Sequence, residues 1–227
     1  MSRRPFVHSY SAGKAYEQCP QLFLQDRVER RFPFVQSPEA KRGDEIHDAL
    51  AEGIKHGKPI PAKFKELDLH LLVEAARGRV GLHLVEQKWA LTKSFEKTGY
   101  FDSDAYYRYR NDYASVTKQK AVIIDWKTGK DKYPDVAQLA EGAVVLMIHY
   151  PEVEEVVSGL VFTATGKMVP ATYTRDDLPM LIDQMAEKYA EIDRAMAEQD
   201  YPLQDGPLCP WCPVTDCPNW RPKPVRR

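Results

Sequence analysis

The sequence lacks the features that mark membrane and secreted proteins. Its longest apolar run, Ala143 to Ile148, is far shorter than the roughly 18 residues that a membrane-spanning helix needs. The N-terminal residues Met1-Ser2-Arg3-Arg4-Pro5 are followed by polar and aromatic residues, and not by the apolar core of a signal peptide. These absences predict a cytoplasmic protein with no membrane partner.

An excess of charge is also missing. The formal net charge is -1 at pH 7, which excludes a global basic field of the kind that announces a nucleic-acid partner. Internal repeats and low-complexity segments are absent as well. Basic residues gather only locally, where solvated surface is the simpler interpretation: Lys118, Lys120, Lys127, Lys130 and Lys132, and in the tail Arg221, Lys223, Arg226 and Arg227.

Cysteine is scarce, with four residues in the chain. Three of them, Cys209, Cys212 and Cys217, lie in a proline-rich tail that is too short to fold around its own core and needs a staple. A closed tetrahedral thiolate site needs four ligands, and Cys19 would be the fourth. In a reducing cytosol such thiols are metal ligands or free thiols more often than disulfides. Four thiolates suit zinc and iron–sulfur clusters alike, and a tail that binds nothing is the remaining alternative.

The rest of the sequence is typical of a globular α/β protein. Hydrophobic residues make up 43% of the chain, which is enough to bury a sizeable core. The hydrophobic periodicity and the turn residues predict helices over 9–31 (with Pro20 as a break or restart), 39–57, 63–79, 136–150 and 175–199, and strands over 82–91, 104–116, 121–126, 155–163 and 167–173. We therefore expect one domain with a mixed β-sheet flanked by helices, divided into a helical part (1–80), a sheet core (81–175), a long helix (176–200) and a tail (201–227).

The most informative segment follows the apolar run 121–124, where Asp125 and Lys127 are two residues apart and would point the same way on a strand. A four-residue turn over 117–120 would pair this strand with the preceding one and set Asp112 opposite Asp125. The Cβ atoms of such a pair lie about 4.5–5.5 Å apart, and two carboxylates that close are destabilising unless a cation lies between them. Mg²⁺ or Mn²⁺ accepts such ligands, and Lys127 would then assist phosphate chemistry.

Seven motifs follow one another along the chain: Cys19-Pro20, Gly43-Asp44-Glu45-Ile46-His47, Asp112, Ile124-Asp125-Trp126-Lys127-Thr128-Gly129-Lys130, Gln138-Leu139, Cys209-Pro210-Trp211-Cys212 and Cys217-Pro218. Taken in this order, they resemble the PD-(D/E)XK nuclease superfamily. The likeness is to its RecB-like members, which include CRISPR-associated four-cysteine nucleases and small phage-type exonucleases.

The resemblance implies a restriction-endonuclease-like core, an N-terminal helical segment and a cysteine-stapled tail. It implies catalytic roles for Asp112, Asp125, Lys127 and Gln138, and a Mg²⁺ or Mn²⁺ site made by His47, Asp112, Asp125 and the backbone carbonyl of Trp126. It also implies a [4Fe–4S] cluster on Cys19, Cys209, Cys212 and Cys217. The gap of four residues before Cys217, where several relatives have five, leaves structural zinc open.

Several candidates compete with these assignments. Asp102 and Asp104 are rival acids, but the hairpin register sets them too far from Asp125. Gln138 could instead form a capping box with Asp135, and the tyrosine of the family's Gln-x-x-x-Tyr pattern is replaced by Gly142. Glu86 could be a supporting carboxylate, although an ion-pair role is commoner for such a residue.

The expected function is therefore a metal-dependent DNA nuclease, in particular an exonuclease on single- or double-stranded ends. Recombination, repair or end processing would be its setting, with a recombinase or helicase as a partner. The alternative is a non-catalytic DNA-binding or scaffolding module with a zinc- or iron–sulfur-stapled tail.

Overall fold

The computed structural model describes residues 5–33, 35–129 and 134–222 of the chain. The chain divides into two compact units, one formed by residues 36–183 and the other by residues 1–35 together with 184–227. We call them the sheet unit and the terminal unit. Across the described ranges, every helix is too short or too polar to cross a membrane.

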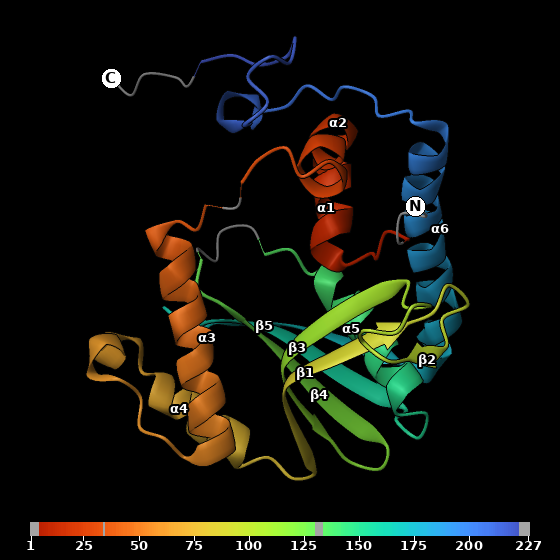
Figure 1. Cartoon of the computed structure of the whole chain (residues 1–227). Helices are drawn as coiled ribbons and strands as arrows, with labels where there is room; N and C mark the ends of the chain where they lie inside the picture. The colour runs from red at the N-terminus through yellow and green to blue at the C-terminus, as the bar shows by residue number, and fades with distance from the viewer. Residues whose placement is uncertain (1–4, 34, 130–133, 223–227) are drawn as a thin grey trace. The chain divides into compact units, whose positions relative to one another are not determined.

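The sheet unit is built on a six-stranded sheet of order β2-β1-β3-β4-β5-β6 (Figure 1). Only β4 and β5 are parallel, and they are joined through α5, so the predicted mixed sheet is confirmed. The strands are β1 (Leu82–Leu91), β2 (Lys97–Thr98), β3 (Tyr107–Val116), β4 (Lys120–Lys127), β5 (Glu155–Phe162) and β6 (Met168–Thr174). The helices of the unit are α3 (Pro38–His56), η2 (Ala62–Leu67), α4 (Leu69–Arg77), α5 (Ala137–His149) and η3 (Arg175–Asp177), and α6 (Leu178–Glu198) begins here.

The β3–β4 hairpin has the register that the sequence predicts. Val116 pairs with Ala121 and Tyr113 pairs with Ile124, and the Thr117 backbone N–H donates to the Lys120 carbonyl at 2.8 Å across the turn. Continued by one residue, this register sets Asp112 opposite Asp125. The hairpin thus carries both acids to the same end of the sheet.

Helices pack on both faces of the sheet. On β5, Val161 belongs to a core with α3 and α4 that includes Leu50 and Trp126, whereas Leu160 and Phe162 pack with Leu139 of α5. Residues 143–147 of α5 are fully buried, as expected for a helix that is apolar all round. Burial of each large side chain contributes about 1.5–3 kcal/mol, so the sheet is held firmly between the two layers.

The sequence-based boundaries fail in two places within the sheet unit. The helix expected over 63–79 is broken at Asp68, whose left-handed backbone (φ 47°) separates the 3₁₀ segment η2 from α4. The strand expected to start at residue 104 begins at Tyr107, because the preceding residues form a loop after the short strand β2. A two-residue strand such as β2 has too little periodicity to be recognised in a sequence.

The terminal unit contains α1 (Tyr10–Gln18), α2 (Pro20–Phe23), the π-helical turn η1 (Leu24–Val28), most of α6 and the 3₁₀ turn η4 (Cys209–Trp211). Ser9 caps α1 by accepting a hydrogen bond from the Ala12 N–H, and the helical segment expected over 9–31 is interrupted at Cys19, where Pro20 predicts a break. Pro20 starts the next helix there, as proline commonly does at a first turn. Phe23 and Tyr189 are fully buried in this unit.

Candidate active site and cysteine pocket

A polar cleft of ≈570 Å³ opens at the end of the β3–β4 hairpin. Helix α3 supplies one wall, and it approaches the chain after β4 so closely that a Cβ on Gly43 would lie 2.9 Å from the Thr128 Oγ1. The glycine therefore lets α3 bring His47, one turn further on, to the strands. The cleft is lined by Asp44, His47, Asp48, Arg110, Asp112, Asp125, Trp126, Lys127, Thr128, Gly129 and Gln138.

The strands are distorted where they carry the cleft. Alternation would keep Tyr109 and Tyr113 on one face of β3, yet Tyr113 donates a hydrogen bond to the Ala76 carbonyl in α4 while the Tyr109 hydroxyl lies against Gly142 in α5. Between them, Glu86 of β1 has a left-handed backbone (φ 56°) and interrupts the β1–β3 pairing opposite Asp112. Between Tyr109 and Tyr113 the side chains of β3 therefore switch from one face of the sheet to the other. Glu86 and Asp112 lie at this switch.

His47, Glu86 and Asp112 form a group whose ligand atoms all lie within 4.8 Å of one another. The His47 Nδ1 lies 3.3 Å from one carboxylate oxygen of Asp112, and the other oxygen accepts the Trp126 backbone N–H at 2.8 Å. The Asp112 carboxylate therefore accepts the backbone N–H of β4 that a strand carbonyl would otherwise accept. This hydrogen bond fixes the direction of the Asp112 side chain. Glu86 also accepts a hydrogen bond from Arg110 at 2.6 Å. One imidazole and two carboxylates are ligands that Mn²⁺ or Mg²⁺ accepts.

Asp125 and Lys127 point the same way along β4, and the Lys127 ammonium lies 2.6 Å from Asp125 Oδ2. The side-chain amide of Gln138 joins both of them: its Nε2 donates to Asp125 Oδ1 at 2.6 Å, and its Oε1 accepts from Lys127 at 2.8 Å. Only a side chain with a donor and an acceptor at its end makes both bonds. Gln138, from the first turn of α5, thus orients the acid and the ammonium together.

Burial in the cleft disfavours ionisation of Asp125, although the Lys127 ammonium lies beside it. Burial, followed by the nearby charge of Asp112, raises the pKa of Asp125 to about 6. Burial alone would lower the pKa of His47, but the hydrogen bond and charge of Asp112 outweigh it and leave the pKa raised. A carboxylate that resists ionisation beside a second carboxylate is a common sign of a functional site.

Tyr109 fills the space that a side chain at Gly142 would need. A Cβ on Gly142 would lie 2.5 Å from the Tyr109 hydroxyl oxygen, so no larger residue fits without a shift of this buried ring. Burial and then the charges of Asp125 and Asp112 hold the pKa of Tyr109 well above its ordinary value. The family's Gln-x-x-x-Tyr pattern has a tyrosine on the helix where this chain has Gly142. The ring of Tyr109, which comes from β3, therefore fills the space beside that glycine.

Some sequence candidates lie elsewhere. Asp102 accepts the Gly99 backbone N–H and Asp104 accepts the Thr98 hydroxyl, so both rival acids serve the loop after β2. Lys120 pairs with Glu155 at the other end of β4. Lys130, Lys132, Lys223, Arg226 and Arg227 lie outside the described residues.

Glu86 was the residue undervalued by sequence reasoning. Its position opposite Asp112 follows from the β1–β3 register, but that register is long-range and no turn in the sequence reveals it. Arg110, Asp44 and Asp48 also line the cleft and were not foreseen. Their spacing in the sequence was the available signal. Arg110 is two residues before Asp112, and Asp44 and Asp48 are three residues before and one after His47.

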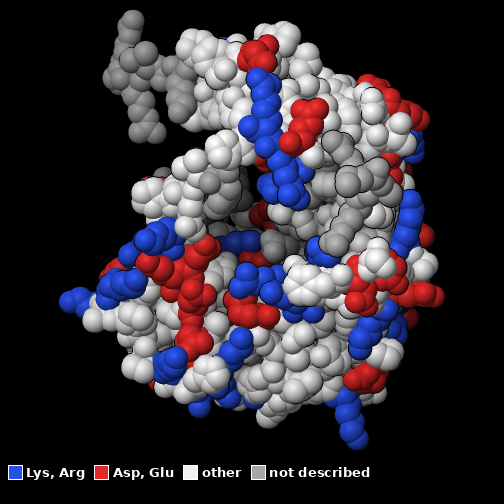
Figure 2. Space-filling view, in the orientation of Figure 1, with Lys and Arg blue, Asp and Glu red and all other residues white. Residues whose placement is uncertain are grey.

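The surface agrees with the low net charge. Figure 2 shows acidic side chains gathered over α3, with Lys and Arg interspersed around them and no large field of one sign on that face. Binding of a polyanion at the cleft would therefore depend on local cations and not on a general attraction.

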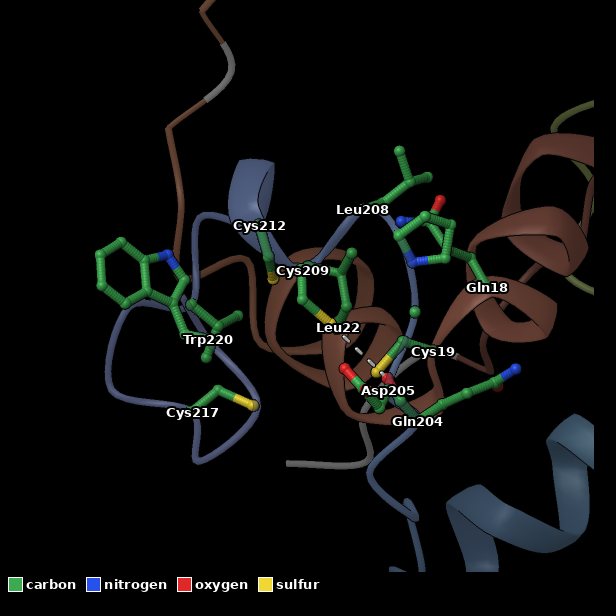
Figure 3. A pocket seen from close by; sticks show the side chains of 13 residues that line it. Gln18, Cys19, Leu22, Gln204, Asp205, Leu208, Cys209, Cys212, Cys217 and Trp220 are labelled. Carbon is green, nitrogen blue, oxygen red and sulfur yellow. Dashed lines mark hydrogen bonds between the residues drawn. The ribbon is translucent and has the colours of Figure 1, made fainter. Parts of the chain in front are cut away.

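The terminal unit contains a second candidate centre, a mainly apolar pocket of ≈180 Å³ (Figure 3). All four cysteines are free thiols and line this pocket, with Leu22, Val214 and Trp220 among the residues around them. Burial, and then proximity to the other three cysteines, raises the pKa of the Cys212 thiol. Arg31–Asp216 and Arg221–Asp205 ion pairs, both 3.0 Å or shorter, tie the tail down around the pocket.

The spacing of the thiols bears on what they could hold. Two sulfurs on one zinc ion lie at most about 4.6 Å apart, twice the Zn–S distance of about 2.3 Å. Among the described residues, His47, Glu86 and Asp112 are the only three ligand-type side chains within 4.8 Å of one another, so no three of the cysteine sulfurs are that close. The pocket is also more than tenfold larger than the roughly 15 Å³ that one water-sized particle needs.

Comparison with known proteins agrees with this architecture. The crystal structure of the "Putative exonuclease" from Eubacterium rectale superposes with a TM-score of 0.54 at 13% identity, covering 97% of this chain and 91% of that one. The structure of SSO0001 covers 96% of this chain and 89% of its own at 11% identity, but its TM-score of 0.46 adds nothing to the fold assignment. A search of curated proteins found no match.

The fold and the hairpin cleft define an α/β protein with a restriction-endonuclease-like core. Residues 110–217 match the family model of the PD-(D/E)XK nuclease superfamily, and this segment carries Asp112, Asp125, Lys127 and the three tail cysteines. Over these residues the chain is similar to that superfamily.

Proposed function

We propose that the protein is a metal-dependent deoxyribonuclease that hydrolyses phosphodiester bonds at DNA ends. The observation that carries the proposal is the polar cleft in which His47 and Asp112 lie beside the Asp125–Lys127 pair, with Glu86 within 4.8 Å of His47 and Asp112. The exonuclease character is supported by the name of the Eubacterium rectale structure and by the resemblance of the motifs. Recombination, repair or end processing, alongside a recombinase or helicase, is the corresponding setting.

The residues present fit a hard divalent cation, Mg²⁺ or Mn²⁺. The donor set offers carboxylate oxygens and one imidazole, and a cation would favour the ionised form of Asp125, which burial and then the charge of Asp112 disfavour. His47, Asp112 and Asp125 would hold the ion with the Trp126 carbonyl, and Glu86 joins them as a ligand. When bound, the ion supplies an activated water and neutralises charge on the phosphate.

The protein's own side chains then orient and stabilise. Lys127 would aim its ammonium at the charge that develops on the phosphate, a contribution that is typically worth 10²- to 10³-fold in rate. Gln138 keeps that ammonium and the Asp125 carboxylate in register, since it bonds to both. The Trp126 N–H holds the Asp112 carboxylate in the position where it forms a group of ligands with His47 and Glu86.

We further propose that the four cysteines hold a [4Fe–4S] cluster. The volume of the pocket, and the finding that no three of the sulfurs lie within 4.8 Å of one another, support a cluster over a single zinc ion. The cluster would staple the tail to Cys19, and its role would be structural. Broad absorbance near 400 nm that accompanies stoichiometric iron would support this assignment; a colourless protein with one zinc would overturn it.

The decisive test of the nuclease proposal is Asp125→Asn, assayed on end-labelled single- and double-stranded DNA with Mg²⁺ or Mn²⁺. We expect cleavage to fall about a thousandfold with the fold intact, because one ligand and the partner of Lys127 are lost. Asp102→Asn is the matched control, since Asp102 serves the loop after β2 and should leave cleavage at the wild-type rate. Wild-type cleavage by the purified Asp125→Asn protein, or full activity in EDTA, would refute the proposal.

A further inference from the structure

Beyond the cleft, β1 and β3 carry a row of cations on one face. Lys88 pairs with Arg110 and Ala90 pairs with Arg108, so the side chains of these even-numbered residues lie on the same face as neighbours. The odd-numbered residues between them, Trp89 and Tyr109, are buried on the other face. Arg110 also lines the cleft and contacts Glu86, so the row begins at the proposed ligands and leads away from them.

Two aromatic rings stand at the far end of this row, in the loop between β2 and β3. The Arg108 guanidinium lies 5.1 Å from the centroid of Tyr100 and 5.7 Å from that of Phe101, and the Lys88 ammonium lies 5.7 and 5.9 Å from the same rings. Phe101 remains 79% exposed. An exposed phenylalanine alone is ordinary, but one placed beside two cations offers a stacking surface with charge next to it.

The positive charges of Lys88 and Arg108 are available to a ligand. Within the described ranges, neither residue forms an ion pair, and the Arg108 Nε is buried without a hydrogen-bond partner. The nearest acids of the loop are engaged by the loop itself, since Asp102 accepts the Gly99 N–H at 3.0 Å and Asp104 accepts the Thr98 hydroxyl at 2.6 Å. These bonds also hold Tyr100 and Phe101 in place before any ligand arrives.

We propose that this row and its two rings, Arg110, Lys88, Arg108, Tyr100 and Phe101, form a binding track for single-stranded DNA that leads into the cleft. Phosphates would lie along the cations, and a base would stack on Phe101. Arg108 lies four residues before Asp112 on the strand, or about 13 Å away, which is the length of roughly four stacked nucleotides. The proposal rests on the proposed nuclease function and adds that the substrate enters the cleft as a single strand.

The exposed ring selects a single strand over a duplex. Bases inside a duplex are stacked on one another and present only their edges, so Phe101 has no face to stack on. An unpaired strand presents both its phosphates and its base faces, which match the cations and the ring. The formal net charge of -1, and the mixed signs of charge on the face drawn in Figure 2, indicate no strong general attraction that would hold a duplex instead.

The track is tested by fluorescence anisotropy of the full chain in EDTA, which prevents cleavage, with labelled oligo(dT) of about 16 nucleotides and a duplex of the same length. We expect Phe101→Ala to weaken binding of the single strand about tenfold, with Phe101→Trp restoring it and Phe101→Leu failing to. Lys88→Gln with Arg108→Gln should reduce the slope of log affinity against log salt by about 0.7 for each phosphate that the variant no longer neutralises. Leu71→Ala and Lys65→Gln, exposed residues on α4 and η2, are the matched controls and should bind as the wild type does.

The outcomes separate this proposal from the nuclease proposal. Single-strand binding by Phe101→Ala and by the Lys88/Arg108 double variant within twofold of wild type would overturn the track, whether or not the wild type cleaves DNA. An equal loss of duplex and single-strand binding would overturn the choice of a single strand. Selective loss of single-strand binding supports the track, even for a wild-type protein that proves inactive in cleavage.

Discussion

The cleft of the sheet unit and the cysteine pocket of the terminal unit are both suited to metal, but they are built in opposite ways. The cleft side chains already bond to one another: Gln138 joins Asp125 to Lys127, and Asp112 accepts the Trp126 N–H. The pocket is lined mainly by apolar groups, and the Cys209 thiol reaches the Gln204 carbonyl only at a long distance of 3.9 Å.

In the cleft, the fold itself holds the side chains in position. In the pocket, a bound group must hold the cysteines in position. The cleft rests on a sheet with helices packed on both faces, so removal of a cation should leave its side chains in position. The described part of the tail from residue 199 onward has only the 3₁₀ turn η4 as regular structure, and a bound group would provide much of its folding energy. Loss of metal should therefore cost activity at the cleft and stability at the pocket.

The largest expected effect on stability comes from Cys212→Ser. Loss of one of four thiolate ligands should release the bound group and destabilise the terminal unit by about 3 kcal/mol or more, which corresponds to a decrease in Tm of roughly 6–12 °C for a chain of this size. The measurement is thermal unfolding followed by circular dichroism, with iron and zinc content determined on the same sample.

Trp211→Ala is the matched control, because Trp211 lies between Cys209 and Cys212 in the sequence, is 55% exposed and does not line the pocket. It should keep both the metal and the wild-type Tm. If Cys212→Ser unfolds at the wild-type temperature with its metal lost, the pocket holds no structural staple and the contrast with the cleft disappears.

Much of the cleft could be predicted from the sequence because its determinants are local. A four-residue turn fixes the register of the β3–β4 hairpin, and alternation fixes the common direction of Asp125 and Lys127. Those two rules bring Asp112 to Asp125 without knowledge of the rest of the fold. The pairing of β4 with β5 through α5 follows likewise from the strand–helix–strand order.

The parts that could not be predicted depend on long-range structure. Glu86 joins the cleft through a left-handed backbone in β1, and the hydroxyl of Tyr109 reaches Gly142 because the strand pair changes face between Tyr109 and Tyr113. Neither event leaves a periodic signal in the sequence. The helix break at Asp68 is similar, since apolar periodicity continues across it, whereas Pro20 marks the break at Cys19 in the sequence.

A smaller effect, on rate, is expected from Gln138→Met. The change removes the donor to Asp125 and the acceptor for Lys127 while keeping the length of the side chain, and we expect kcat to fall about 30-fold because the two charged groups lose their common anchor. Gln138→Glu should add a negative charge beside Asp125, raise the pKa of Asp125 further and move the acid limb of the pH–rate profile to higher pH.

The control for Gln138 is Gln119→Met, in the exposed turn at the other end of the hairpin, which should cleave at the wild-type rate. A kcat for Gln138→Met within twofold of wild type would mean that the fold positions Asp125 and Lys127 without help from α5. The contrast would then sharpen, because the cleft would depend on the sheet alone.

The smallest effect is a pH dependence of stability in the metal-free protein. The pKa of Asp125 is raised to about 6 from 3.8, so the folded state binds this proton more tightly than the unfolded state and is stabilised as the pH falls. The raised pKa of His47 acts in the same direction, because its contribution is present below about 6.5 and is lost as the pH rises through the folded value. From pH 7.5 to 5.5, Asp125 alone should add roughly 1 kcal/mol, or 2–4 °C in Tm.

The measurement is the Tm of wild type minus that of Asp125→Asn in EDTA at the two pH values, since the subtraction cancels carboxylates elsewhere. Added Mg²⁺ should reverse the trend, because a bound cation favours the ionised carboxylate; a difference that does not change with pH would show that Asp125 is no more strained in the fold than in water.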